Sequence, residues 1–419
     1  MLDPRHQPKW RPVALQGWGS NERGQLGVAD GGPSDTVEHA SPVPTRVEVD
    51  LRKGWGGTVR QLAAGGAHSA LLADDGHLFL WGGNEAGQLG TGGTPGRVLV
   101  DGPDQVHSFP RRVAMVALGH AHTLVLEQGT GRVFGVGANG AGEATGRRGA
   151  EDRGNCREEG GALVRPSSLE GGERGGARRD DDVRMRFIAA GVRHSAGITE
   201  CGALVTWGGR THGEGLPPGV GPWRPADGAE VVSVACGWRH TVLLDARGRV
   251  YSLGAHKHGQ RGLGDGDDNA DAADPLPWRV PLEAEVEEVA SGWSHVLAQM
   301  RDGQVYGWGR NSFGQLGLGP DAPARVAAPV RLPLPEGAAP VRHVAAGSEF
   351  SLVVGADGGV YMCGWNEHAN LGQGHRDDSL VWVRVPMSES IEALARADQL
   401  LVACGGAHVL TLAREQTEK

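Results

Sequence analysis

The chain has 419 residues, a formal net charge of −9 at pH 7 and five cysteines. The acidic balance argues against bulk attraction to nucleic acid or to an anionic membrane, and no apolar run reaches the roughly 18 residues of a spanning helix. The N-terminal stretch MLDPRHQPKWRP lacks the apolar core of a signal peptide, and no Cys-x-x-Cys pair suggests a zinc site or a disulfide framework. We therefore expect a protein of a reducing compartment, the cytoplasm or also the nucleus.

One glycine-rich motif recurs along the whole chain. A half copy, LQGWGSNERGQLG, is followed by a first full copy, AAGGAHSALLADDGHLFLWGGNEAGQLG, and the chain ends with the complementary half, VACGGAHVLTLA. Six full copies and two halves make seven units, which indicates a repeat fold and not a single catalytic loop. The half copies begin at Leu15 and Val402, and the full copies begin at Ala63, Val116, Ile188, Val234, Val289 and Val344.

Each unit contains the signals of four short strands. In the first full copy QLAAG and HSALLA are predicted strands, DDG is a turn suited to the positive φ of glycine, and HLFLWG is a third strand. The loop NEAGQLG precedes a fourth strand with nearby prolines, as in SPVPTRVEV, and proline favours an edge position. Seven such units predict an all-β fold, a seven-bladed β-propeller of four-stranded blades.

The split copy at the two ends predicts how the ring closes. Pairing of Ala14–Trp18 with Val402–Leu412 would build one blade from both terminal segments and remove two unpaired strand edges. We expect one propeller domain over residues 14–412, an N-terminal extension over 1–13 and a tail over 413–419.

Two charged segments interrupt the repeat. Residues 147–182 are rich in Arg, Glu, Asp and Gly, which predicts a flexible solvated loop, with a partner-docking arm as the alternative. Within this insert, LVRPSSL is expected to keep the outer strand of its blade. The acidic stretch GDGDDNADAAD, from Gly264, is interpreted as a second solvated loop.

The histidines of the motif G-x-x-H are expected to be structural. A metal ring would require ligands to converge within about 2.0–2.1 Å of one ion, whereas equivalent residues on successive blades encircle the axis. We expect each imidazole to bond to backbone, and one copy has Phe at this position. The motif positions are His68, His122, His194, His240, His295, Phe350 and His408.

Other chemical signals are weak. GVGANG (Gly135–Gly140) fits G-x-G-x-x-G, but no helix is predicted after it, so we expect no dinucleotide or other cofactor. Cys236 and Cys404 stand among small residues near the crowded axis and are interpreted as small apolar side chains and not as reactive thiols. No carboxylate pair or Ser-His-Asp set separates from the repeats, so we expect no metal site and no enzyme.

Two consecutive repeats carry tryptophan at the same turn. Trp238 lies in CGWRHTV and Trp293 in SGWSHVL, where the repeat does not require a large aromatic residue. They either pack against neighbouring blades or anchor a partner on one face, and Arg239 beside Trp238 favours the second interpretation because interface hot spots are enriched in Trp and Arg.

The last full copy differs from the others in GSEF and WNEHAN. These stretches place Glu349, Glu367 and His368 in loops, and loops on a rigid scaffold often carry function. The candidate contacts to a protein partner are therefore Trp238, Arg239, Trp293, Glu349, Glu367 and His368.

The copies GAHSALLADDGHLFLWGGNEAGQLG and GWSHVLAQMRDGQVYGWGRNSFGQLG resemble the regulator of chromosome condensation (RCC) repeat family. Its motif is G-x-x-H-[ST]-x-x-L, then D-G-x-[VL]-[YW]-x-[WF]-G-x-N-x-x-G-Q-L-G. The resemblance extends from Leu15 to Leu412 and implies a seven-bladed propeller. The stretches CGWNEHANLGQG and VAAGSEF resemble two small branches, the animal secretion-regulating exchange-factor-like proteins and the fungal killer-toxin-insensitivity proteins.

The two branches imply different functions. The fungal branch implies a non-enzymatic scaffold, monomeric or in a heterodimer, for a small CSL-type zinc protein acting in diphthamide synthesis and Elongator-dependent tRNA wobble-uridine modification. The founding member of the family exchanges nucleotide on Ran, which implies the alternative, a guanine nucleotide exchange factor or regulator for a Ran-like or secretion-related small GTPase. GWRHT also resembles the plant UV-B photoreceptor, which uses a tryptophan cluster on adjacent blades. This chain has the full GWRHT motif once, and the next repeat has GWSHV in its place. We expect the scaffold, without direct contact to nucleic acid or membrane.

Overall fold

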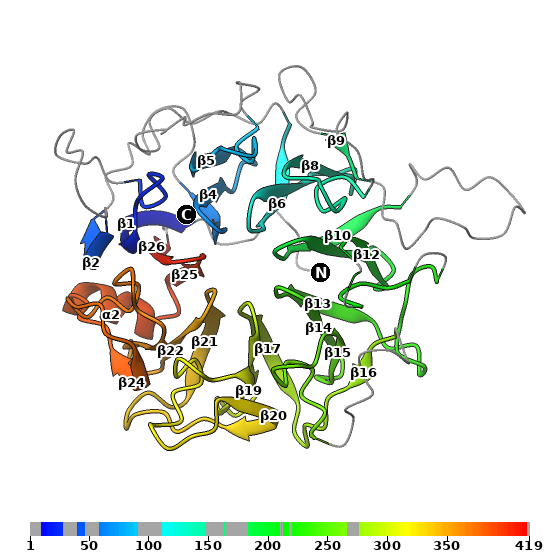
Figure 1. The fold of residues 1–419 in the computed structure, drawn as a ribbon. Coiled ribbons are helices and arrows are strands. Elements are labelled where there is room, and N and C mark those ends of the chain that lie inside the picture. Colours follow the sequence, from blue (N-terminus) through cyan, green and yellow to red (C-terminus); the bar gives the residue numbers. More distant parts are fainter. Residues whose placement is uncertain are drawn as a thin grey trace, which may run out of the picture.

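The computed structural model describes residues 10–27, 40–46, 58–90, 111–146, 162–164, 183–209, 211, 213–217, 220–265 and 276–416. Seven antiparallel sheets stand in a ring around a central axis (Figure 1). Five of the sheets have four strands and two have three within these residues. The predicted seven-bladed β-propeller is confirmed.

The blades are numbered along the chain, each from its innermost strand outward. Blade 1 contains β3 (Val59–Ala64), β4 (His68–Ala73) and β5 (Leu78–Gly82), and blade 2 contains β6 (Val113–Leu118), β7 (His122–Glu127), β8 (Val133–Gly137) and β9 (Ala162–Leu163). Blade 3 contains β10 (Met185–Ala190), β11 (His194–Thr199) and β12 (Leu204–Gly208), and blade 4 contains β13 (Val231–Cys236), β14 (His240–Asp245), β15 (Val250–Gly254) and β16 (Trp278–Arg279). Blade 5 contains β17 (Val286–Ser291), β18 (His295–Met300), β19 (Val305–Arg310) and β20 (Arg325–Arg331). Blade 6 contains β21 (Val341–Ala346), β22 (Phe350–Gly355), β23 (Val360–Gly364) and β24 (Ser379–Arg384), and blade 7 contains β25 (Leu400–Cys404), β26 (His408–Gln416), β1 (Trp10–Ser20) and β2 (Ala40–Arg46).

Blade 7 closes the ring as the sequence predicts. Strand β26 pairs with β1 in a register that runs from Trp10 opposite Gln416 to Gly19 opposite His408. The pairing extends past the expected limits of the domain at Ala14 and Leu412. Strand β2, with Pro42 and Pro44, forms the outer edge of this sheet, where no ladder donor is needed.

The charged insert lies mostly outside the described residues. Ala162 and Leu163 form β9 and pair with Gly135 and Phe134 of β8, so the outer strand of this blade includes Leu163, the first residue of the expected stretch LVRPSSL. Residues 165–169 of that stretch lie outside the described part of the chain. The rest of residues 147–182 and most of the second acidic stretch, residues 266–275, lie outside the described part of the chain.

One helix was not predicted from the sequence. Helix α2 (Glu389–Arg396) lies between β24 and β25 and buries Ile391 and Ala395 in the same apolar cluster as Val409 and Ala413 of β26. Its apolar pattern is short, and the helix lies in the connection between blades 6 and 7, so the repeat pattern gave no signal for it. Within the described ranges, no helix has the length and apolar character to cross a bilayer.

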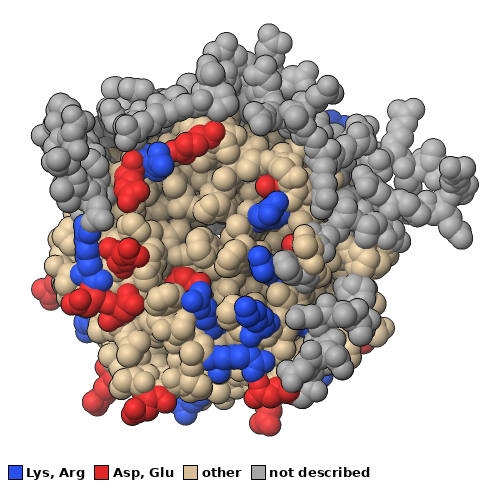
Figure 2. All heavy atoms as spheres, viewed as in Figure 1, with Lys and Arg blue, Asp and Glu red and all other residues tan. Residues whose placement is uncertain are grey.

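The innermost strand and the third strand of each blade end on the same side of the ring. The turn of the G-x-x-H motif and the glycine-rich loop therefore share one face, which we call the loop face. Gly82 allows this close approach in blade 1, because its φ is +101° and a Cβ there would lie 2.7 Å from the Ala67 carbonyl oxygen. Figure 2 shows the charged residues on the face that is turned toward the viewer in Figure 1.

The motif histidines connect neighbouring blades around the ring. All six are fully buried, and each Nε2 lies 2.8–3.0 Å from a Ser or Thr hydroxyl of the next blade. Most of these hydroxyls donate to a backbone carbonyl, as Ser69 does to Gln25 at 2.7 Å, so the hydroxyl accepts from a protonated Nε2. The histidines are structural as predicted, but the predicted backbone partner is wrong, since each Nε2 pairs with a hydroxyl on the next blade, at least 47 residues away in the sequence.

The glycine of G-x-x-H is required by the same histidine. A Cβ on Gly65 would lie 2.5 Å from the Cε1 of His68 and 2.6 Å from the Gly119 carbonyl oxygen of the next blade. Phe350 replaces histidine where the next blade offers Val409 in place of a hydroxyl, and both side chains belong to one buried cluster. The motif is therefore a blade-to-blade contact, which makes the loop face a rigid platform.

Candidate functional site

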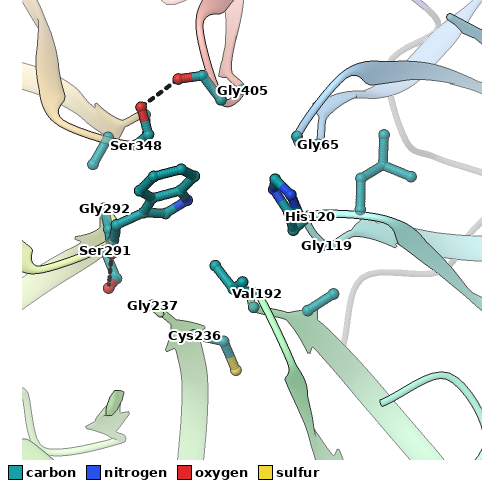
Figure 3. A pocket seen from close by; sticks show the side chains of 18 of the residues that line it. Gly65, Gly119, His120, Val192, Cys236, Gly237, Ser291, Gly292, Ser348 and Gly405 are labelled. Carbon is teal, nitrogen blue, oxygen red and sulfur yellow. Dashed lines mark hydrogen bonds between the residues drawn. The ribbon is translucent and has the colours of Figure 1, made fainter. Parts of the chain in front are cut away.

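A central channel opens at the middle of the loop face. The turns of the G-x-x-H motifs line it, and it encloses a cavity of about 250 Å³. His120, Val192, Cys236 and Ser348 lie around the axis on four different blades (Figure 3). Cys236 and Cys404 both line this channel, and burial raises the pKa of Cys236 to about 12, which agrees with their interpretation as unreactive small residues.

An aromatic row follows one side of the channel mouth. The rings of Trp238 and Trp293 are 5.8 Å apart, and His120 approaches Trp293 edge-on at 5.9 Å. The guanidinium of Arg239 lies 4.8 Å from the ring centre of Trp238. The backbone N–H of Trp238 donates to the carbonyl of Trp293 at 2.9 Å, so the two turns are tied together. The rings therefore pack across blades, as one of the two interpretations expects. Trp238 is 37% exposed, and its role as an anchor for a partner stays a prediction.

An aromatic pocket lies beside this row. It encloses about 450 Å³ between blades 5, 6, 7, 1 and 2, and we call it the aromatic pocket. Its larger side chains are those of Glu22, Arg23, His120, Trp293, Arg310, Phe313, Glu349, Trp365 and His368.

Glu349 is buried at the base of the aromatic pocket. Its carboxylate accepts from Arg310 at 2.9 Å and from the Gln315 side-chain amide at 2.5 Å. Burial raises the pKa of Glu349, and the contacts with Gln315 and Arg310 oppose that rise. The Arg310 guanidinium lies 4.9 Å from the ring centre of Phe313. Glu349 is therefore a buried group that fixes Arg310 at the rim, and its predicted contact with a partner stays a prediction.

Glu367 and His368 lie at the other side of the pocket. The ring of His368 meets that of Trp365 at 5.1 Å, and its Nδ1 is 3.7 Å from a carboxylate oxygen of Glu22 in blade 7. His368 lines the pocket, whereas Glu367 is exposed and lines neither the pocket nor the channel.

A second concavity lies between blades 3 and 4 on the same face. It encloses about 540 Å³ and includes Trp238 and Arg239 together with Arg193, and we call it the basic groove. Five of the six sequence-derived residues thus line two concavities of one face, with Trp293, Glu349 and His368 at the pocket and Trp238 and Arg239 at the groove, while Glu367 lies outside both. The contact between the two tryptophans joins the concavities.

Sequence reasoning missed several side chains of the pocket. Arg310 and Phe313 occupy variable positions of the glycine-rich loop in WGRNSFGQLG, and Trp365 holds the equivalent of Arg310 in the next repeat. Large or charged residues at these variable positions were a signal in the sequence. Within the described ranges, no three His, Cys, Asp or Glu side chains converge as metal ligands, and no helix follows the glycines at 135–140 in residues 138–146.

The sequence and fold were compared with those of known proteins. The RCC1-like domain matches residues 14–411. The secretion-regulating guanine nucleotide exchange factor of Bos taurus is 31% identical, over an alignment that covers 96% of this chain and 83% of the relative. The ultraviolet-B receptor UVR8 of Arabidopsis thaliana is 29% identical, but the alignment covers 73% of this chain and only 63% of the receptor.

Solved structures share the fold at lower identity. Human WBSCR16 superposes with a TM-score of 0.73 at 23% identity, covering 96% of this chain and all of that chain. Prp20p of Saccharomyces cerevisiae superposes with a TM-score of 0.71 at 21% identity, covering 98% and 94%. The domain match over nearly the whole chain, with a relative at 31% identity, shows that this protein belongs to the RCC1-like domain family.

Proposed function

We propose that this protein regulates a small GTPase as a guanine nucleotide exchange factor, and that the loop face around the aromatic pocket is the docking surface. The support from sequence is the relative of 31% identity that is named as an exchange factor and aligns over 96% of the chain. The scaffold for a CSL-type zinc protein, which the sequence motifs favoured, has no support among the relatives described above.

The observation that carries this proposal is the fixed guanidinium of Arg310. It donates to the buried carboxylate of Glu349, and the side-chain amide of Gln315 donates to the same carboxylate and fixes it, so little side-chain freedom is lost when a partner binds. Around it stand Trp293, Phe313 and Trp365, rigid aromatic side chains of the type that dominates interface energetics.

Exchange requires differential binding and no catalytic residue. A factor accelerates nucleotide release when it binds the nucleotide-free state of the GTPase more tightly than the nucleotide-bound state. A rigid face serves this purpose, because it favours the one partner conformation that fits it. The free cysteines Cys201, Cys236, Cys363 and Cys404 accord with a place in the cytoplasm or nucleus.

The test is release of a fluorescent GDP analogue from a panel of small GTPases of the same organism, Ran and secretion-related members included. We expect acceleration with one member, and a loss of about tenfold or more in that acceleration for Arg310→Ala. Arg247→Ala serves as the matched control, since Arg247 is exposed, pairs with Asp227 and lies at the turn between β14 and β15, on the opposite face.

Two results would contradict the proposal. One is that no GTPase of the panel releases nucleotide faster. The other is tight one-to-one binding to the CSL-type zinc protein of the organism without any effect on nucleotide release, which would return the function to the scaffold.

A further inference from the structure

The basic groove has a charge that differs from that of the rest of the protein. Arg193 and Arg239 both line the groove, and Trp238 offers an exposed indole beside them. The positive charge continues outward from the groove around His258. Burial lowers the pKa of His258, and so do the charges of its neighbours Arg310, Lys257, Arg325 and Arg239. We call Arg193, Arg239, Lys257, Arg310 and Arg325 the basic band. In a chain of net charge −9, this concentration of cations is a local exception.

Much of the basic band lacks a counter-charge. Among the side chains that the structure describes, no carboxylate lies within ion-pair distance of Arg193, Arg239 or Lys257, and all three are exposed. The other two members pair with carboxylates, Arg310 with Glu349 and Arg325 with Asp265. Among the described residues that line the groove, Glu214 is the one acidic group, but it is only 3% exposed. The band therefore already binds carboxylates at one end and has unpaired cations at the other.

We propose that the basic groove binds an acidic segment of a partner protein, with its carboxylates on Arg193, Arg239 and Lys257 and an apolar side chain on Trp238. Planar guanidinium groups favour bidentate pairing with carboxylates, and the indole provides apolar contact area next to them. The inference does not depend on nucleotide exchange, because the groove is separate from the aromatic pocket.

The charge distribution of the loop face favours a short acidic segment over nucleic acid. Lys and Arg gather in the right and lower part of Figure 2, whereas Asp and Glu are more frequent toward its left edge. Glu22, Glu85 and Glu367 are exposed and belong to the glycine-rich loops of blades 7, 1 and 6. A long polyphosphate backbone that crossed the face would meet these carboxylates, whereas a short acidic segment would end before them.

The experiment uses the full chain and two fluorescein-labelled peptides. In the first peptide Asp and Glu surround a single Leu, and in the second the acidic residues are replaced by Asn and Gln. We expect the acidic peptide to bind more tightly, and we expect the double change Arg193→Gln with Arg239→Gln to weaken it by about tenfold or more. The matched control is Arg112→Gln with Arg247→Gln, which removes the same charge at two exposed positions on the opposite face. Because all four arginines are exposed, both variants should retain the thermal unfolding of the parent.

The outcomes separate this proposal from the exchange function. Loss of peptide binding in the groove variant, with the control variant unchanged, supports the groove whatever happens to nucleotide release. Equal binding of both peptides, equal binding by both variants or no binding at all overturns it. A single-stranded oligonucleotide that binds more tightly than the acidic peptide also overturns it, in favour of nucleic acid.

Discussion

Mild acid should unfold this propeller because six buried histidines must stay neutral in the folded protein. Burial lowers the pKa of His68, His122, His240 and His408 from 6.5 to about 3, and that of His194 and His295 to about 4. The Nδ1 of each ring has no hydrogen-bond partner, so a second proton would be buried without an acceptor. The six histidines lie in blades 1 to 5 and in blade 7, so the effect is spread around the ring, and blade 6 carries Phe350 in their place.

The direction of the effect follows from proton linkage. A base whose folded pKa lies below its unfolded pKa contributes its full stability above the unfolded value of 6.5, and this contribution falls as the pH drops from there toward the folded value. Between about pH 7.5 and about pH 5.5 an unfolded histidine takes up most of a proton and the folded one almost none, which amounts to about 1.4 kcal/mol per histidine. Six histidines give about 8 kcal/mol, a large share of the roughly 5–15 kcal/mol by which proteins are stable.

Other titrating groups do not cancel this effect. Contacts with Glu288 and Asp398 raise the pKa of His343, and burial raises that of Glu349, so these two residues gain stability as the pH falls. The carboxyls with lowered pKa values, such as Asp75 and Glu127, lose their contribution only below their ordinary values of 3.8 and 4.5. The interval between about pH 7.5 and about pH 5.5 therefore reports mainly on the six buried rings.

The assay is urea unfolding at several pH values in that interval, followed by tryptophan fluorescence. The variant His295→Phe copies the ring found naturally at Phe350, and we expect its unfolding free energy to depend on pH with about one proton less than the parent. An unfolding free energy that stays constant across the interval would refute the reasoning, and so would NMR titration of the six imidazoles near 6.5 in the folded protein.

Three further predictions concern single contacts and the closure of the ring. Phe350→His would place an imidazole opposite Val409, with no hydroxyl to accept the hydrogen bond from its N–H. We expect the free energy of unfolding, measured with urea, to fall by about 1–3 kcal/mol. An unchanged value would show that the hydroxyl partner is dispensable. Glu349→Ala removes the buried partner of Arg310 and should cost about 2–4 kcal/mol in the same assay, while the exposed change Glu367→Ala should alter stability by less than about 0.5 kcal/mol; equal effects would contradict the assigned burial. Deletion of the residues after Val402 removes β26, which is the pairing partner of both β1 and β25. We therefore expect the truncated chain to show no cooperative unfolding transition by circular dichroism. A truncated chain that melts like the parent would refute closure by the terminal strands.

The fold could be predicted because each blade is a local pattern repeated many times. The apolar strands and the glycines at turns can each be recognised within a short stretch of sequence. The two half copies at the chain ends are complementary, which predicts that they pair in one blade. The glycine of G-x-x-H is of the same kind, since Gly65 and His68 are three residues apart and touch. Helix α2 escaped prediction because it belongs to a connection that occurs once.

The sequence indicated six candidate contact residues, but only the tertiary structure decided which side chains surround them. Trp238, Trp293, Glu349 and His368 departed from the repeat, and that departure brought them to attention. Their surroundings depend on neighbours supplied by other blades. Glu349 is buried against Arg310, 39 residues away, and residues of five blades line the aromatic pocket. The same holds for the hydroxyl partners of the histidines and for the unpaired cations of the basic groove. A repeat determines each blade through contacts within a few residues, whereas the distances between blades, which set burial and charge pairing, exist only once the ring has closed.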